Sequence, residues 1–266
     1  MTPREYARLE HTTPYCYTLS INGGTLGYFG AHHSNKPSDE MFAMLHAFYE
    51  VIKPDIVFVE GMSDPRVRLE VSRLIEKMSF TEAIVQGGEP LYAAKLAVEH
   101  GVPWECPEPS DGALYQELLQ DGFMKHEIAA FNVLMVLPQW QRRDEIMSFE
   151  DYAKPFIEQF KRSTKWTDDV YTYEAAMKTA VRTLGNSIDL QDREKAERLV
   201  DPIPWPHYRT RQTVFNALAA AHSRIRDEHM IKEMLTPLLA KQRVLIVFGA
   251  SHAVMQEPAL RALSSE

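Results

Sequence analysis

The strongest constraint on the fold is the alternation of short β-type runs with helical segments between Tyr15 and Pro107. Two β-rich runs lie within residues 15–29, and further runs occur at 55–59 and 102–106. The segments between them carry apolar residues at helical spacing. Such alternation is typical of a mostly parallel sheet flanked by helices. The sequence therefore predicts an α/β fold.

Turn and capping residues locate the elements more closely. Asn22-Gly23-Gly24 predicts a hairpin connection between the first two strands. One helix is expected after Pro37-Ser38, and Ser63-Asp64-Pro65 predicts the start of the next. Residues 81–85 are interpreted as a short strand that leads into a helix at Gly87-Gly88-Glu89-Pro90.

The pattern changes at Asp111, where long helical periodicities replace the alternation as far as about Lys241. A β-type run then returns at 243–248, so we expect the first and last strands to share one sheet. The predicted division is an α/β core of 1–110 and 207–266 with an α-helical insertion of 111–206. We expect this insertion to cover the strand ends as a lid.

Two of the β-type runs end in the same Gly-x-x-His motif. One reads Gly30-Ala31-His32-His33 and the other Gly249-Ala250-Ser251-His252. The glycine permits a sharp turn out of the sheet, and the histidine is left at the carboxyl edge, where open α/β sheets bind ligands. A third run ends in Glu60. We interpret His33, His252 and Glu60 as one shared site.

Two imidazoles and a carboxylate suit two kinds of chemistry. They can bind Zn, Mn, Co or Fe and leave positions open for water, which would then be the nucleophile. They can also move protons without a metal. His32 is either a further ligand or only a neighbour, because its side chain should point away from that of His33 in an extended chain.

Three other side chains are candidates for the same site. Glu89 and Glu108 follow the next strand-like segments and could act as a general base or orient a ligand. Glu89 beside Pro90 is equally well explained by a helix N-terminus, where negative charge is stabilised. On the last long helix, Arg224 and Arg226 are typical of a solvated face, although one of them could stabilise an oxyanion.

Charge and cysteine content exclude several classes of partner and location. A net charge of −8 provides no basic patch for nucleic acid or an anionic membrane surface. No apolar stretch approaches the roughly 20 residues of a membrane span, and the first residues are polar. Cys16 and Cys106 are too few for a disulfide framework. We therefore expect a cytoplasmic protein with no nucleic-acid or membrane partner.

The strand-end motifs resemble those of the superfamily of TraB-like and Tiki-like proteins, to which erythromycin esterase and a haem-binding lipoprotein are related. The resemblance rests on the two Gly-x-x-His motifs, the strand ending in Glu60, and the C-terminal block from Arg226-Asp227 to Met230. It implies that His33, His252 and Glu60 are functional, that Arg226 stabilises an oxyanion and that Glu108 is a site acid. Residues 116–206 are unmatched.

Together these observations predict a hydrolase that activates water to cleave an amide, peptide or ester bond in a small-molecule or peptide substrate. In the metal-dependent version, His33, His252 and Glu60 hold Mn, Zn or Co. Two alternatives stay open: a metal-independent esterase with His33 as general base, like the erythromycin esterases, and a haem- or small-ligand-binding protein. The oligomeric state is open too, with a homo-oligomer among the alternatives.

Overall fold

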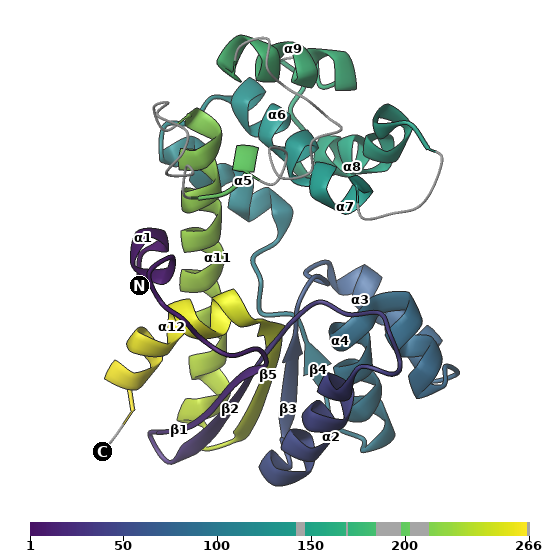
Figure 1. The fold of residues 1–266 in the computed structure, drawn as a ribbon, viewed down its shortest axis with the longest axis vertical. Helices are drawn as coiled ribbons and strands as arrows, with labels where there is room; N and C mark the ends of the chain where they lie inside the picture. Colours follow the sequence, from purple (N-terminus) through teal and green to yellow (C-terminus); the bar gives the residue numbers. More distant parts are fainter. Residues whose placement is uncertain (142–146, 169, 185–197, 203–212, 265–266) are drawn as a thin grey trace. The chain divides into compact units, whose positions relative to one another are not determined.

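The computed structural model describes residues 1–141, 147–168, 170–184, 198–202 and 213–264 (Figure 1). The chain divides into two compact units, one of Met1–Pro109 with Asp227–Glu266 and the other of Ser110–Arg226. The second unit extends further than the predicted insertion of 111–206, because helix α11 (Val214–Leu239) begins in the second unit and ends in the first.

The first unit is built on a five-stranded sheet in the order β1-β2-β5-β3-β4. The strands are β1 (Tyr15–Ile21), β2 (Gly24–Ala31), β3 (Ile56–Val59), β4 (Trp104–Glu105) and β5 (Arg243–Gly249). Strands β1 and β2 form the predicted antiparallel hairpin, and every other pairing is parallel. The α/β prediction is confirmed, and so is the expectation that early and late strands share one sheet.

Helices cover both faces of this sheet (Figure 1). On one face, α2 (Glu40–Ile52) and α4 (Phe80–Glu99) pack on Phe29, Val59 and Val247. On the other, the end of α11 and α12 (Ala250–Ala262) pack on Tyr28, Phe58 and Ile246. Adjacent residues of β2, β3 and β5 thus enter opposite apolar clusters, as expected for strands buried on both sides. The remaining helices of the unit are α1 (Pro3–Tyr6) and α3 (Pro65–Ile75).

The predicted strand at 81–85 is wrong, because these residues belong to α4. Ser79 and Glu82 form a reciprocal capping box that starts the helix here. Ala83 and Ile84 are buried, so tertiary packing overrides the β preference of the apolar run. The helix predicted to begin at the glycine pair is present as the second part of α4, which is separated from the first part by a kink at Gly88, with φ 63° and ψ −145°.

In the described part of the second unit, all regular secondary structure is helical and no strand occurs. The helices are α5 (Asp111–Gln120), α6 (Lys125–Met135), α7 (Leu137–Gln141), α8 (Phe149–Thr164), α9 (Tyr173–Leu184) and the first half of α11. They enclose a separate apolar core around Leu118, Phe131 and Phe215. The predicted start of the last helix at Thr210 lies outside the described residues. None of the helices in the described ranges is long and apolar enough to cross a membrane.

Candidate functional site

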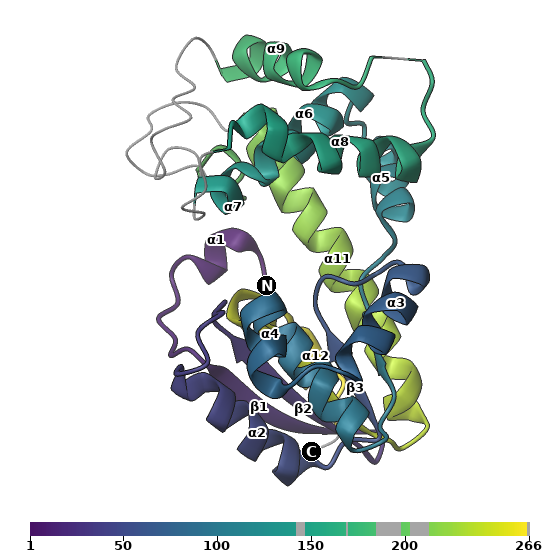
Figure 2. The ribbon, with the colours of Figure 1, turned by 90° about the vertical axis from the view of Figure 1, so that its right-hand side faces the viewer.

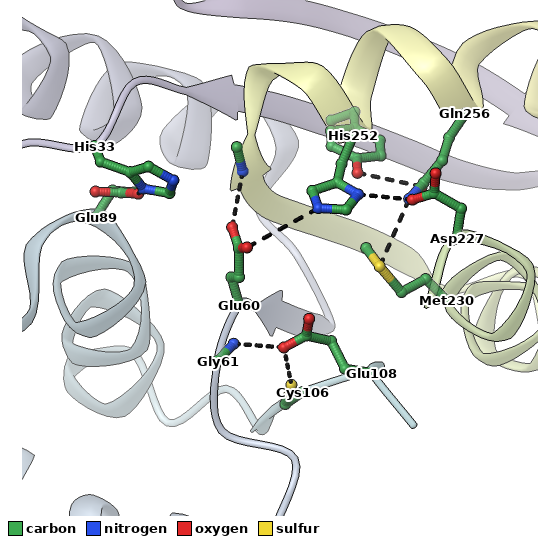
Figure 3. Close-up of polar contacts among 12 residues, drawn as sticks. His33, Glu60, Gly61, Glu89, Cys106, Glu108, Asp227, Met230, His252 and Gln256 are labelled. Atoms are coloured by element: carbon green, nitrogen blue, oxygen red, sulfur yellow. Dashed lines mark hydrogen bonds and ion pairs between the residues drawn. The ribbon is translucent and has the colours of Figure 1, made fainter. Parts of the chain in front are cut away.

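Three neighbouring strands of the sheet end at one edge and bring the predicted residues together (Figure 3). In the parallel register, Ala31 of β2 lies beside Gly249 of β5, and Val59 of β3 lies beside Val247. His33, Glu60 and His252 follow these strand ends by one to three residues. The common edge therefore results from the register of three strands that are distant in sequence.

Glu60 occupies the middle of this edge, and Figure 3 draws it between the two imidazoles. Its Oε2 accepts a hydrogen bond of 3.0 Å from the Gly249 N–H, while its Oε1 lies 4.0 Å from His252 Nε2. A Cβ atom on Gly249 would lie 3.7 Å from both Glu60 Oε2 and His33 Nε2. Glu60 and His33 thus both lie close to Gly249 at the end of β5.

His33 is solvent-accessible but is anchored by a buried acid. Its Nδ1 lies 2.6 Å from Glu89 Oε1, and its side chain is 72% exposed whereas that of Glu89 is 2% exposed. A carboxylate can only accept, so this contact places a proton on Nδ1, and Figure 3 draws Nε2 on the side of Glu60. Glu89 was predicted as a site residue, and the structure brings it to His33.

The kink at Gly88 is what aims Glu89 at His33. Its positive φ with ψ −145° is a conformation that only glycine adopts without strain. A Cβ atom there would lie 2.8 Å from the Ser34 carbonyl oxygen, next to His33 in the chain. Gly88 therefore permits both the turn of α4 and its close approach to the segment that carries His33.

His252 has a carboxylate partner of its own, which the sequence did not reveal. Its Nδ1 lies 2.6 Å from Asp227 Oδ1, and the same oxygen accepts a 2.7 Å hydrogen bond from Gln256 Nε2. The Tyr28 hydroxyl donates to Gln256 Oε1 at 3.2 Å, which fixes the orientation of the amide. Gln256 is 1% exposed. These contacts hold the His252 ring with Nε2 directed at Glu60.

The signal that could have identified Gln256 is its position. It lies one turn after His252 on α12, on the side where Ala253 and Leu260 are fully buried. A buried amide among apolar residues needs a polar partner. Asp227 belongs to the sequence block that carried the family resemblance, but its pairing with His252 depends on how α11 packs on α12.

His32 turns away from His33, as expected for an extended chain. Its Nε2 lies 2.8 Å from Asp39 Oδ2, while Asp39 Oδ1 accepts from the Met41 N–H and caps α2. The hydrogen bond from His32, with that from the Met41 N–H, lowers the pKa of Asp39 to about 2. His32 therefore contacts Asp39, the residue that caps the N-terminus of α2.

Glu108 holds the chain immediately after Glu60. Its Oε2 accepts hydrogen bonds from the Gly61 N–H at 2.7 Å and from the Cys106 thiol at 3.4 Å. Burial, together with the charge of Glu108, raises the pKa of Cys106 to about 12. Cys106 is thus a protonated thiol at neutral pH and a poor nucleophile. Arg226 belongs to the second unit, and its role as an oxyanion-stabilising group stays a prediction.

The donor chemistry of the edge suits a divalent transition metal, since it combines imidazole nitrogens with carboxylate oxygen. In the part of the chain that the structure describes, however, no three His, Cys, Asp or Glu side chains are arranged as they stand to hold an ion. Metal binding would have to draw the donors together.

Comparison with known proteins gives no match to a protein family, to a curated protein or to a solved structure.

Proposed function

We propose that this chain is a hydrolase that activates a water molecule beside Glu60, between His33 and His252, to cleave an amide, peptide or ester bond. The observation that supports it is the pair of carboxylate-backed imidazoles on either side of Glu60. The resemblance of the strand-end motifs to the Tiki-like and erythromycin esterase-like proteins supports the same class. A cytoplasmic location and a small-molecule or peptide substrate belong to this proposal.

In the leading version, His33 and His252 hold a divalent metal through their Nε2 atoms, with Glu60 as a ligand or as the base. The metal would lower the pKa of bound water toward neutrality and polarise the scissile carbonyl. Glu89 and Asp227 would then orient the two histidine ligands. Each carboxylate accepts a hydrogen bond from the Nδ1–H of one imidazole, which fixes the tautomer of that imidazole and raises the basicity of its Nε2. The Gly249 N–H donates to Oε2 of Glu60, while Oε1 faces His252 Nε2 at 4.0 Å, and the water would lie beside Oε1.

A second version needs no metal and is favoured by the exposure of His33. An imidazole that is 72% exposed and backed by a buried carboxylate is well placed to take a proton from water directly. Glu89 would stabilise the imidazolium that forms, as the aspartate of a catalytic triad does. Arg226 is the candidate for stabilising the developing oxyanion in either version. A haem- or small-ligand-binding role is the alternative from a different class.

Metal analysis and chelation separate the two versions. The purified full chain is assayed on a panel of aryl esters, amides and peptides before chelation, after it, and after return of Mn, Zn or Co. Loss of hydrolysis on chelation with recovery on one of these metals supports the metal version. Full hydrolysis by metal-free protein, with a bell-shaped pH profile, supports His33 as base. Absence of hydrolysis under every condition contradicts the proposal and favours ligand binding.

A further inference from the structure

The helical unit contains an open cavity of about 310 Å³. It lies between α6, α9 and the segment that precedes α9, and these two helices pack side by side (Figures 1 and 2). Three basic side chains line it: His126 from α6, and Lys178 and Arg182 from α9. No Asp or Glu of the described residues is part of the lining. The lining is therefore basic.

Among the residues that the structure describes, none neutralises these three basic groups. Lys125, next to His126, forms a 2.7 Å ion pair with Asp168. His126, Lys178 and Arg182, by contrast, form no ion pair or side-chain hydrogen bond with residues in the described ranges. Lys178 and Arg182 are four residues apart on one helix, where like charges repel and destabilise the helix. An anion between them would relieve that repulsion.

The rest of the lining shows what kind of anion would fit. Thr179 is 8% exposed and adds a hydroxyl beside the two cations. Ala129, Ala176 and Val170 form an apolar part of the wall, although Val170 is 66% exposed. The volume is at the lower end of the roughly 300–1,000 Å³ typical of small-molecule sites. The cavity thus combines a cationic end with an apolar wall.

We propose that this cavity binds a small organic phosphate. A phosphate monoester carries about −1.5 to −2 charges at neutral pH and three strong acceptor oxygens, which matches two cations and a hydroxyl. The guanidinium of Arg182 can bind two of these oxygens at once, and Lys178 supplies the second charge. The carbon portion of the ligand lies against Val170 and Ala129. This site lies wholly within the second unit and does not depend on the proposed hydrolysis.

The test titrates phenyl phosphate into the full chain by calorimetry. We expect saturable one-to-one binding with a Kd of about 1 mM or tighter. Arg182→Gln should weaken it about 10-fold or more, because a charge-assisted contact to phosphate is lost. Arg162→Gln is the matched control, since it removes the same charge from an exposed position on α8 outside the cavity lining. It should leave the Kd unchanged.

Three results would overturn the proposal. They are a Kd weaker than about 1 mM or no saturable binding at all, equal weakening by Arg182→Gln and Arg162→Gln, and benzoate binding as tight as that of phenyl phosphate. The first shows that the cavity takes no such ligand, the second that the attraction is only diffuse charge, and the third that phosphate is not the selected group. Because glutamine is a good helix former and both positions are exposed, the variants should keep their helical content by circular dichroism.

Discussion

The two histidines of the candidate site differ in how they meet solvent. The side chain of His33 is 72% exposed, whereas that of His252 is 12% exposed and packs edge-on against Phe248. Both use Nδ1 for a carboxylate, at the same 2.6 Å separation. The exposed His33 ring can therefore meet a substrate or water, while His252 is held rigidly beside Glu60.

The rigidity of His252 should depend on Gln256, because Gln256 donates to the same Asp227 oxygen that the imidazole contacts. Gln256→Leu removes the donor that fixes Asp227 Oδ1, so the Nδ1–H tautomer of His252 should lose population. Two-bond ¹H–¹⁵N correlation spectra of the imidazoles measure this directly and need no substrate. His33 serves as the internal control and should keep its signals.

Tyr28→Phe is the milder variant, because it keeps Gln256 and removes only the hydroxyl that orients the amide. It should shift the His252 tautomer ratio in the same direction, by less. An unchanged His252 spectrum in both variants would show that Asp227 is positioned without them.

Among the elements, α4 has the closest link between backbone conformation and site geometry. Gly88→Ala should destabilise the protein by about 1–3 kcal/mol, because a strained φ/ψ pair and a clash with the Ser34 carbonyl are both introduced. It should also displace Glu89, so the His33 Nδ1–H signal should weaken. Chemical unfolding and the imidazole spectra are the measurements.

Gly101→Ala is the matched control for this variant. Gly101 also has a positive φ, of 66°, at the end of α4, but a Cβ atom there meets nothing within 4 Å. It should lower stability and leave the His33 spectrum unchanged. If both variants alter His33 equally, the kink does not aim Glu89.

The start of α2 gives a prediction about pH. Asp39→Ala removes both the cap and the partner of His32 and should cost about 1 kcal/mol at neutral pH. Because the folded-state pKa of Asp39 is lowered to about 2, its charge stabilises the protein above the unfolded value of about 3.9. That contribution is lost as pH falls from about 4 toward 2.

Unfolding free energies measured between pH 2 and 7 test this, with Asp39→Asn as the control that can still cap but cannot ionise. The difference between the parent and Asp39→Asn should shrink as pH falls below about 4. A difference that stays constant over this range would contradict the assignment.

At the scale of the whole molecule, the two units have separate apolar cores. Phe131→Ala leaves a cavity in the core of the second unit and should destabilise that unit by about 3–5 kcal/mol. Native-state hydrogen exchange should then show faster exchange in α6 and α9 and unchanged protection in β5. Equal loss of protection in β5 would show that the units unfold as one.

The sequence predicted the fold class and the edge of the sheet because these depend on local patterns. Gly-x-x-His after a β-type run, and Glu60 after another, are readable from neighbouring residues. The pairing of His252 with Asp227 was not readable, since it depends on the packing of α11 against α12. The strand predicted at 81–85 failed for a different, local reason, as the capping box of Ser79 and Glu82 outweighs the apolar run.

The most direct test of the proposed site is hydrolysis by the parent chain and by Glu60→Gln on the same panel of esters, amides and peptides, each supplied with Mn, Zn or Co. Removing the central carboxylate should reduce kcat by about 100-fold or more, and the control Glu76→Gln, at an exposed position beyond α3, should leave it unchanged. Hydrolysis by Glu60→Gln at the rate of the parent would contradict a site centred on Glu60.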